Sequence, residues 1–513
     1  MEQMPNTAPD KPNGGGGVSS SSVSHVGANT ISSNTTLSDA SYDSSTGAQN
    51  ALLVTGGEVV LDNITVTKTG DDDGDESDFY GTNAAIFAYN DAKVTINDTQ
   101  IQTDGSHANA VFAYGNATIN IDNSSITTNS NNSGGIMVTG GGTINATDLM
   151  VNTSGNSSAA IRSDRGGGII NVEGGSYTTT GVGSPAIYST ANINIKKSIL
   201  MSTASEGVVI EGKNSVTLDS VTLNATNSSL NGQSETFKSI FIYQSMSGDA
   251  AEGKGSFTAN NSMIITHQGD HFYVTNTDAE IVLSGNKFIQ NDETGAFLRA
   301  EGAAWGNTGS NGGNVLLNVT KQEVLGDIIT DNISTVDFRM TSSYFKGAIT
   351  GDGKTQLTVS ADSIVVLTGD SYVSSLSNAQ IDNSNIYGNG FKLFVNGTEV
   401  ATNTATAPES TFDEFCTING DNCYEEESAE VIETTTTTTT SSKSDNGFPV
   451  WGIVAIVGGV LIIVLAIILI AMKMKKGPKP PETPQVPEVP QIPEMQNPMP
   501  PETPSVPPFG NAN

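Results

Sequence analysis

A short acidic run holds the densest set of oxygen ligands in the chain. Residues 71–78 read Asp-Asp-Asp-Gly-Asp-Glu-Ser-Asp, which places carboxylates at Asp71, Asp73, Asp75 and Asp78. Ca²⁺ binds clustered carboxylates, and a glycine among them permits a tight turn. The run is either a calcium site whose spacing differs from that of an EF-hand loop, or a solvated acidic loop. No other cofactor is expected.

A second charged group has the residue types that polysaccharide cleavage needs. Lyases and glycoside hydrolases use clustered carboxylates, or a basic residue beside bound calcium. Arginine is rare in this chain, yet Arg162 and Arg165 flank Asp164. Asp164 and Arg165 are therefore the candidate catalytic residues, and adjacent repeats would add Glu173 and Glu211. A salt-bridged corner explains the same residues, so the expectation is a protein that is not an enzyme.

Aromatic residues spread along the chain are candidates for carbohydrate binding, because sugars stack on flat apolar rings. The three candidates are Tyr89, Tyr114 and Trp305. Phe87 with Tyr89, and Phe112 with Tyr114, recur at the spacing of one repeat. Alternate residues of a strand share a face, so these pairs form either a sugar platform or part of the core.

The two cysteines, Cys416 and Cys423, are close in sequence. In an oxidising compartment they would form a short-loop disulfide, and the alternative is two free thiols in a flexible stalk. The four histidines (His25, His107, His267 and His271) show no spacing typical of metal ligands.

The composition limits both the fold and the partners. The chain has 513 residues, of which 6% are aromatic, and a formal net charge of −32. So few large apolar residues predict a thin, repeated core rather than a conventional globular one. The negative charge repels phosphates, so no nucleic-acid partner is expected.

An internal repeat of roughly 22 to 26 residues gives the strongest indication of fold. Each repeat contains three short apolar segments separated by Asn, Asp, Ser and Gly. The first column contains Ile86, Val111, Ile136, Ile161 and Ile187. The second contains Val94-Thr-Ile96, Ile119-Asn-Ile121, Ile144-Asn-Ala146, Ile170-Asn-Val172, Ile193-Asn-Ile195 and Val216-Thr-Leu218. The third contains Ile101, Ile126, Val151, Tyr177, Leu200 and Leu223.

Three strands and three corners in about 24 residues match one coil of a parallel β-helix, whose strands pair with their equivalents in the next coil. Asn, Ser and Gly suit the corners because they tolerate left-handed backbone or bond their own backbone. We therefore predict an all-β solenoid over residues 25–400 with about fifteen coils. Loops at 228–238, 247–255 and 300–313 are expected to be insertions on one face, where solenoids often bind ligands.

The ends of the chain predict further segments. Residues 1–24, rich in Pro, Gly and Ser, are expected to be disordered, and they lack the pattern of a secretory signal. Residues 401–449 read as an acidic, Thr-rich stalk. Residues 450–472 are uncharged and would form a transmembrane α-helix of about 34 Å. Residues 473–513 form a Pro-rich tail that either binds a proline-reading module or stays solvated.

The charges beside the apolar segment predict its orientation. Lys473, Lys475, Lys476 and Lys479 follow it, whereas acidic residues precede it. The positive-inside rule then places the C-terminus in the cytoplasm and the N-terminus outside. We expect a single-pass protein held in the lipid bilayer of the plasma membrane by residues 450–472.

Several stretches of the repeat resemble those of a known family. They are Gly-Asn-Ala-Thr-Ile-Asn-Ile at 115–121, Gly-Gly-Ile-Met-Val-Thr-Gly-Gly-Gly at 134–142 and Ser-Ser-Ala-Ala-Ile-Arg-Ser-Asp-Arg-Gly-Gly-Gly at 157–168. On these motifs, roughly residues 45–400 resemble pectin-lyase-like right-handed parallel β-helix proteins, especially adhesin-like surface proteins of gut bacteria and mucosal protists. The resemblance implies a right-handed coil and surface attachment, and it implies no particular chemistry.

These observations predict a cell-surface, adhesin-like binding protein that presents a rigid acidic rod to glycans or proteins of a host or neighbouring cell. The alternative is a membrane-anchored polysaccharide lyase or glycoside hydrolase of the β-helix class. The absence of a signal pattern keeps a third option open, which is an intracellular membrane rod.

Overall fold

The computed structural model describes residues 23–232 and 234–409 of the chain. The predicted transmembrane segment 450–472, the tail 473–513 and the two cysteines lie outside these residues, as do most of the leader 1–24 and of the stalk 401–449. Among the described residues, no helix has the length and apolar character needed to cross a membrane.

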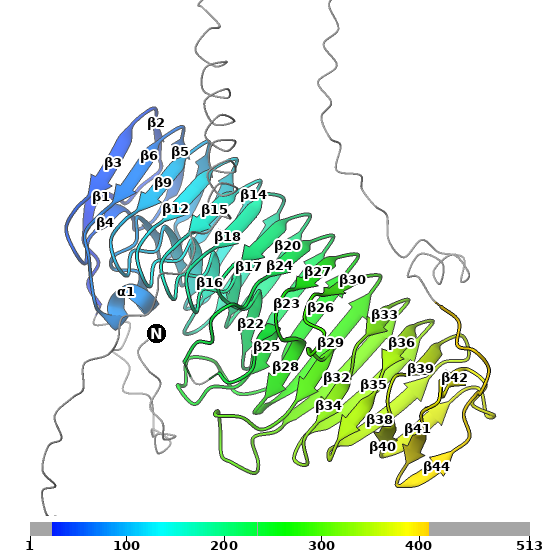
Figure 1. The fold of residues 1–513 in the computed structure, drawn as a ribbon. Coiled ribbons are helices and arrows are strands. Elements are labelled where there is room, and N and C mark those ends of the chain that lie inside the picture. The colour runs from blue at the N-terminus through cyan, green and yellow to red at the C-terminus, as the bar shows by residue number, and fades with distance from the viewer. Residues whose placement is uncertain (1–22, 233, 410–513) are drawn as a thin grey trace, which may run out of the picture. The chain divides into compact units, whose positions relative to one another are not determined.

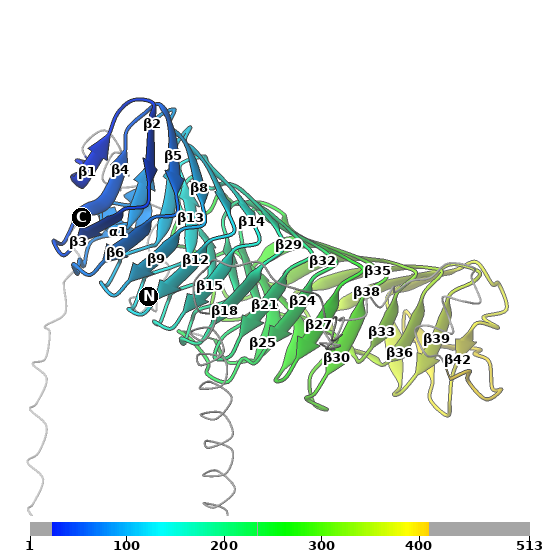
Figure 2. The ribbon, with the colours of Figure 1, turned by 90° about the horizontal axis from the view of Figure 1, so that it is seen from above.

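The described chain is a parallel β-solenoid built from three long sheets, here called A, B and C, as predicted (Figure 1). Each coil contributes one strand to each sheet in turn, and every strand pairs in parallel with its equivalents in the coils before and after it. Sheet B has 14 strands, one for each coil, compared with the fifteen coils expected. Figure 2 shows the same coils from above, in order from β1 to the C-terminal end.

The strands have the following bounds. Sheet A contains β1 (Gly27–Ile31), β4 (Asn50–Val54), β7 (Ile86–Ala88), β10 (Val111–Tyr114), β13 (Ile136–Thr139), β16 (Ile161–Ser163), β19 (Ile187–Ser189), β22 (Val208–Glu211), β25 (Lys238–Tyr243), β28 (Asp270–Thr275), β31 (Leu298–Ala300), β34 (Ile328–Thr330) and β37 (Ile349–Gly351). Sheet B contains β2 (Thr35–Ser38), β5 (Glu58–Asp62), β8 (Lys93–Asn97), β11 (Thr118–Asp122), β14 (Gly142–Thr147), β17 (Gly168–Glu173), β20 (Asn192–Lys196), β23 (Ser215–Asp219), β26 (Gly255–Asn260), β29 (Thr277–Ser284), β32 (Gly313–Thr320), β35 (Thr335–Thr341), β38 (Lys354–Val359) and β41 (Ser375–Asn378). Sheet C contains β3 (Ser41–Ser44), β6 (Thr65–Lys68), β9 (Gln100–Thr103), β12 (Ser125–Thr128), β15 (Met150–Thr153), β18 (Ser176–Thr179), β21 (Ile199–Ser202), β24 (Thr222–Ala225), β27 (Met263–Thr266) and β30 (Lys287–Gln290).

Two small sheets complete the C-terminal end of the solenoid. A fourth sheet takes over the third strand position of the last coils and contains β33 (Glu323–Leu325), β36 (Tyr344–Gly347), β39 (Ile364–Leu367) and β42 (Ile386–Tyr387). A fifth contains β40 (Ser371–Val373), β43 (Leu393–Val395) and β44 (Thr398–Val400). β43 and β44 pair antiparallel, so the solenoid ends in a hairpin rather than in another coil.

The predicted apolar columns stack in the predicted register. Ile119 lies opposite Val94 and Ile144 in sheet B, and Ile126 lies opposite Ile101 and Val151 in sheet C. These side chains belong to one continuous apolar core that extends from Ile31 to Leu393. A single coil has too little apolar surface to bury alone, so each coil is stabilised by its neighbours.

Polar side chains at the corners satisfy the backbone groups that the strands leave unpaired. At the turn from sheet B to sheet C, the N–H of Val221 donates to Ser262 Oγ (3.1 Å), that of Ser262 to Asn286 Oδ1 (2.9 Å) and that of Asn286 to Gln322 Oε1 (2.9 Å). Buried backbone donors are costly without partners, so this ladder explains the Ser and Asn of the repeat. Left-handed backbone at corner residues such as Asn63 (φ 50°) and Asn123 (φ 45°) was also expected.

The one helix among the described residues, α1 (Asp75–Tyr80), lies in the acidic run that was expected to be a loop. Its first turn carries Asp75, Glu76 and Asp78, and negative charge there interacts favourably with the helix dipole. Gly81 ends the helix in left-handed conformation, at φ 72°. Part of the acidic run, residues 75–80, is therefore helical rather than an open loop.

Candidate functional site

The four longest insertions in the described coils border sheet A. Residues 71–85, which contain α1, precede β7, and residues 228–238 lead into β25. Residues 247–255 and 300–313 follow β25 and β31 and lead into sheet B. The prediction that the three long loops lie on one face is confirmed, and Figure 1 shows α1 and the long loops beside the sheet A strands.

The outward side chains of sheet A form a row along the solenoid axis. The register places these residues opposite one another in order: Leu53, Phe87, Phe112, Met137, Arg162, Tyr188, Val209, Phe241, Tyr273 and Arg299. Arg162 and Arg299 are the charged residues among these, and Arg162 lies between two apolar clusters.

The first cluster, around Phe87 and Phe112, includes two of the predicted carbohydrate-binding residues. The Phe87 ring lies 5.6 Å from Tyr89 and 4.5 Å from His25, which stacks on it. The Tyr114 ring lies 5.8 Å from that of Tyr80 at the end of α1. Tyr89 and Tyr114 therefore share the outer face, and both contact a covering segment rather than forming a bare platform.

The second cluster contains the third carbohydrate-binding candidate. Trp305 is 8% exposed, and its ring lies 5.1 Å from Phe241 and 5.4 Å from Tyr243. A sugar needs a free ring face, which this side chain lacks. The expectation that Trp305 is a binding platform is therefore wrong in this structure: the 300–313 insertion folds it onto sheet A as packing.

A pocket of about 460 Å³ lies between the two clusters, with Arg162 among its lining residues. Asp73, Asp75, Asp78 and Phe79 come from the α1 segment. Tyr188 and Glu211 come from sheet A strands, and Asp164 directly follows one. Ser247 and Asp249 come from the insertion that follows β25. The pocket brings together two groups of candidates, the acidic run and Asp164, that the sequence left separate.

Asp164 is the most strongly perturbed carboxyl group of the pocket. It is 5% exposed, receives the backbone N–H of Arg165 at 3.0 Å and lies 3.4 Å from Arg162 Nη2. Burial raises its pKa to about 7, the charge of Arg162 opposes that rise, and Asp249 and Glu211 add to it. A carboxyl group with such a pKa can exchange a proton near neutral pH.

Arg165, the other catalytic candidate, connects the two walls of the pocket. Its Nε lies 2.5 Å from Asp249 Oδ1 in the 247–255 insertion, and its guanidinium carbon lies 3.6 Å from the centre of the Phe79 ring in α1. The ion pair and the cation–π contact each add stability in a partly buried setting. Arg165 is therefore a positioning residue for the pocket in this structure.

Glu211 and Glu173, the two carboxylates expected to join Asp164, have different positions. Glu211 is 1% exposed and accepts the hydroxyls of Tyr188 (2.6 Å), Tyr243 (3.2 Å) and Ser245. Burial raises its pKa, and these hydroxyls oppose the shift. Glu173 is on the outer face of sheet B, 3.5 Å from Lys197, so its expected place beside Asp164 is wrong. The chain passes from one sheet to the next within a few residues, so residues that are close in sequence can lie on different faces of the solenoid.

The acidic run does not converge on one point. Asp71 accepts the N–H of Ser106 at 2.9 Å, whereas Asp78 Oδ1 lies 3.0 Å from His107 Nδ1. The neighbouring Asp78 carboxylate raises the pKa of His107. Asp73 and Asp75 line the pocket instead. Within residues 23–232 and 234–409, no three His, Cys, Asp or Glu side chains are placed to hold a metal ion, so the geometry adds no support for calcium at Asp71, Asp73, Asp75 and Asp78.

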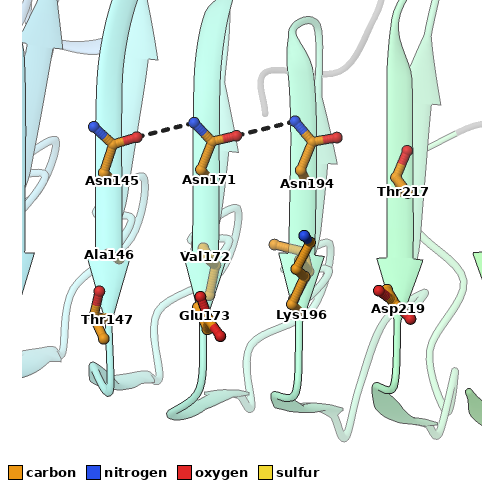
Figure 3. Close-up of a pocket in the computed structure, with 11 residues that line it drawn as sticks. Asn145, Ala146, Thr147, Asn171, Val172, Glu173, Asn194, Lys196, Thr217 and Asp219 are labelled. Carbon is orange, nitrogen blue, oxygen red and sulfur yellow. Dashed lines mark hydrogen bonds between the residues drawn. The ribbon is translucent and has the colours of Figure 1, made fainter.

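The outer face of sheet B carries a second depression of about 460 Å³, which has a plain and repetitive lining (Figure 3). Asn194 donates to Asn171 at 3.0 Å, and Asn171 donates to Asn145 at 2.9 Å. These residues are spaced 23 and 26 positions apart, which is the repeat itself. Glu173 and Lys196 form part of a second row beside the ladder (Figure 3). No insertion from the described coils covers this face.

Comparison with family models, curated proteins and solved structures finds no match to this chain. The sheet A pocket offers one carboxyl group able to exchange a proton, several fixed carboxylates and a buried guanidinium, which suits recognition of a polar ligand.

Sequence reasoning missed Phe79, His107, Tyr188 and Asp249 as members of the pocket. One signal was available: a charged Arg162 occupies a repeat position at which its neighbours Met137 and Phe112 are apolar. A polar residue in an otherwise apolar column marks the place where the outer face changes its role.

Proposed function

We propose that this protein is a cell-surface, adhesin-like binding protein whose ligand site is the sheet A pocket. The observation that carries the proposal is that the insertions, both outer aromatic clusters and a pocket lined by buried charges all lie on sheet A. Insertions that do not serve a solenoid's core commonly serve its binding surface.

The setting of the solenoid in the cell belongs to the same proposal. The coil is right-handed, and residues 450–472 span the plasma membrane with the solenoid outside and the C-terminus in the cytoplasm. Support comes from the uncharged segment, the lysines that follow it and the general preference for right-handed crossovers. The partners are glycans or proteins of a host or neighbouring cell, and a proline-reading module is a partner for the tail.

The test is attachment of cells that display the full-length chain, compared between matched pairs of variants. Arg165→Ala with Asp249→Ala removes the contact that joins the pocket walls. Lys197→Ala with Glu173→Ala removes an exposed ion pair on sheet B. We expect the first pair to reduce attachment at least tenfold and the second to leave it unchanged. Equal effects of the two pairs would refute the site, and antibody staining confined to permeabilised cells would refute the exposure.

Asp164 favours a second candidate function, hydrolysis or elimination of a polysaccharide. A general acid is most effective when its pKa lies near the working pH, and burial raises the pKa of Asp164 to about 7. Release of reducing ends from a polysaccharide panel, abolished in Asp164→Asn and retained in Asn171→Ala, would establish this activity. A wild-type chain that binds a polysaccharide without cleaving it would rule the activity out for that substrate.

A further inference from the structure

Sequences of the form Asn-x-Ser/Thr, which accept N-linked glycans in secreted chains, are unevenly placed on the solenoid. They occur on strands of sheets B and C, at the corners and in the terminal hairpin. Among the described residues, none begins in a strand of sheet A or in the four insertions that border it. Asparagine is present in those insertions, but Ala85 takes the hydroxyl position after Asn83, and Gly309 takes it after Asn307. The face that carries the pocket therefore lacks acceptor sites.

At four of these sequences the asparagine and the hydroxyl residue are both exposed, so solvent surrounds the acceptor amide. They are Asn34 with Thr36, Asn63 with Thr65, Asn152 with Ser154 and Asn396 with Thr398. Asn34 precedes β2 and Asn63 follows β5, so both lie at corners that adjoin sheet B. Asn152 is on the outer face of sheet C in β15, and Asn396 lies in the turn between β43 and β44.

The amides at these sites can be modified without a loss of packing. The Asn63 amide donates to Asp39 Oδ1 at 2.7 Å on the exposed surface. A free amide has two N–H groups and a glycosylated amide keeps one, so modification does not require this bond to break. The side chains of Asn152 and Asn396 have no hydrogen-bond partner among the described residues.

An acceptor sequence beside a sheet A insertion provides the contrast. Asn227 comes immediately before the 228–238 insertion and is followed by Ser228 and Ser229, but it is only 1% exposed. Its Nδ2 donates to the backbone oxygen of Lys238 at 3.1 Å, which joins the two ends of the insertion. A glycan is bulky and hydrophilic, so this fold requires Asn227 to be unmodified.

We propose that the four exposed asparagines carry N-linked glycans and that the outer face of sheet A stays free of them. This inference rests on the proposed function, because a chain meets the glycosyl donor only on a route to the cell surface. The donor is a lipid-linked oligosaccharide diphosphate. The asparagine Nδ2 attacks the anomeric carbon, the bond from that carbon to the diphosphate oxygen breaks, and the lipid diphosphate leaves with the electron pair. Nδ2 loses one proton, and sheet A is the face left open to a partner.

The test is mass spectrometry of the full-length chain taken from cells that display it and that make N-linked glycans. Peptide-N-glycosidase removes each glycan and converts its asparagine to aspartate, and water enriched in heavy oxygen labels the new carboxylate. We expect labelled aspartate at the four exposed sites and none at Asn227, Asn83 or Asn307. Absence of label from the four sites, or label at Asn227, would overturn the inference.

Matched variants separate a glycan from spontaneous deamidation, to which Asn396 is prone because Gly397 follows it. Thr398→Ala removes the hydroxyl that the acceptor sequence needs, and Thr398→Ser keeps it. Thr65→Ala and Thr65→Ser make the same pair for Asn63. These threonines are exposed, so all four variants should fold. We expect the label to be lost in the Ala variants and kept in the Ser variants, and label that persists in the Ala variants would overturn the inference.

Antibody staining of the same cells distinguishes the failure of this inference from the failure of the proposed function. Staining of intact cells with the four sites unlabelled would overturn the glycans alone, and the surface role would stand. Staining confined to permeabilised cells would overturn both.

Discussion

The outer faces of sheets A and B are made by the same repeat, yet they differ in almost every property that matters for recognition. On sheet B, Asn145, Asn171 and Asn194 repeat one hydrogen bond along the axis under open solvent. On sheet A, the equivalent row changes from Met137 to Arg162, and insertions cover it on both sides. The repeat therefore builds the rod, and departures from the repeat build the pocket.

A charge placed inside the coil should destabilise sheets A and B together, because their inward side chains belong to one core. Ile121 is 1% exposed, and Ile121→Asp buries an unpaired carboxylate, with an expected loss of at least about 4 kcal/mol in the free energy of unfolding. Asn120→Asp, one residue away on the outer face, should cost less than about 0.5 kcal/mol. Urea unfolding of the two variants measures the difference, and similar midpoints would contradict the inward and outward assignment.

A large-to-small change on the covered face should cost nearly as much. Phe112 is fully buried beside Phe87, and Phe112→Ala should lower the free energy of unfolding by about 3 to 4 kcal/mol through lost burial and a cavity. The same urea experiment gives the value. A loss below about 1 kcal/mol would mean that the segment over sheet A does not pack there.

The pH dependence of stability should also distinguish the sheet A pocket, which contains Asp164, from the outer face of sheet B. The pKa of Asp164 rises from 3.8 to about 7 on folding, so the folded state holds more protons than the unfolded state between about pH 4 and pH 7. Stability from this group is therefore present below that window and is lost as pH rises through it, by an amount on the order of 2 kcal/mol. Urea unfolding from pH 4 to pH 8 should show this loss in the wild type and in Asn171→Ala, and much less of it in Asp164→Asn. Parallel curves for all three proteins would show that Asp164 ionises normally.

The smallest effect is expected on the sheet B ladder. Asn171→Ala removes one bond donated to Asn145 and one accepted from Asn194 (Figure 3). Solvent replaces both bonds, so the cost in unfolding free energy should be about 1 kcal/mol or less, with ligand binding unchanged. A loss of binding in this variant would move the ligand site to sheet B.

The sequence predicted the solenoid well because its information is local and repeated. Columns such as Val94, Ile119 and Ile144 fix the inward face, the register and the sheet in a single step. The terminal hairpin of β43 and β44 was missed because it occurs once, so no other coil reveals it. Helix α1 was missed because six residues in an acidic run show no apolar period.

The candidate site was predicted only in part. The rarity of arginine drew attention to Asp164 and Arg165, and the repeat correctly suggested Glu211. The contact between Arg165 and Asp249 spans 84 residues and depends on the conformation of an insertion, which no repeat specifies. The partnership of Asp78 with His107 likewise depends on α1, so histidine spacing in sequence gave no sign of it.

Hydrogen–deuterium exchange of the full-length chain, with and without its bound target, tests most directly whether sheet A carries the binding site. We expect protection at residues 71–82 and 244–254, which form the walls of the pocket, and unchanged exchange in the β14, β17 and β20 segments of sheet B. Protection concentrated on the sheet B ladder, with the pocket walls unaffected, would place the binding site on sheet B instead.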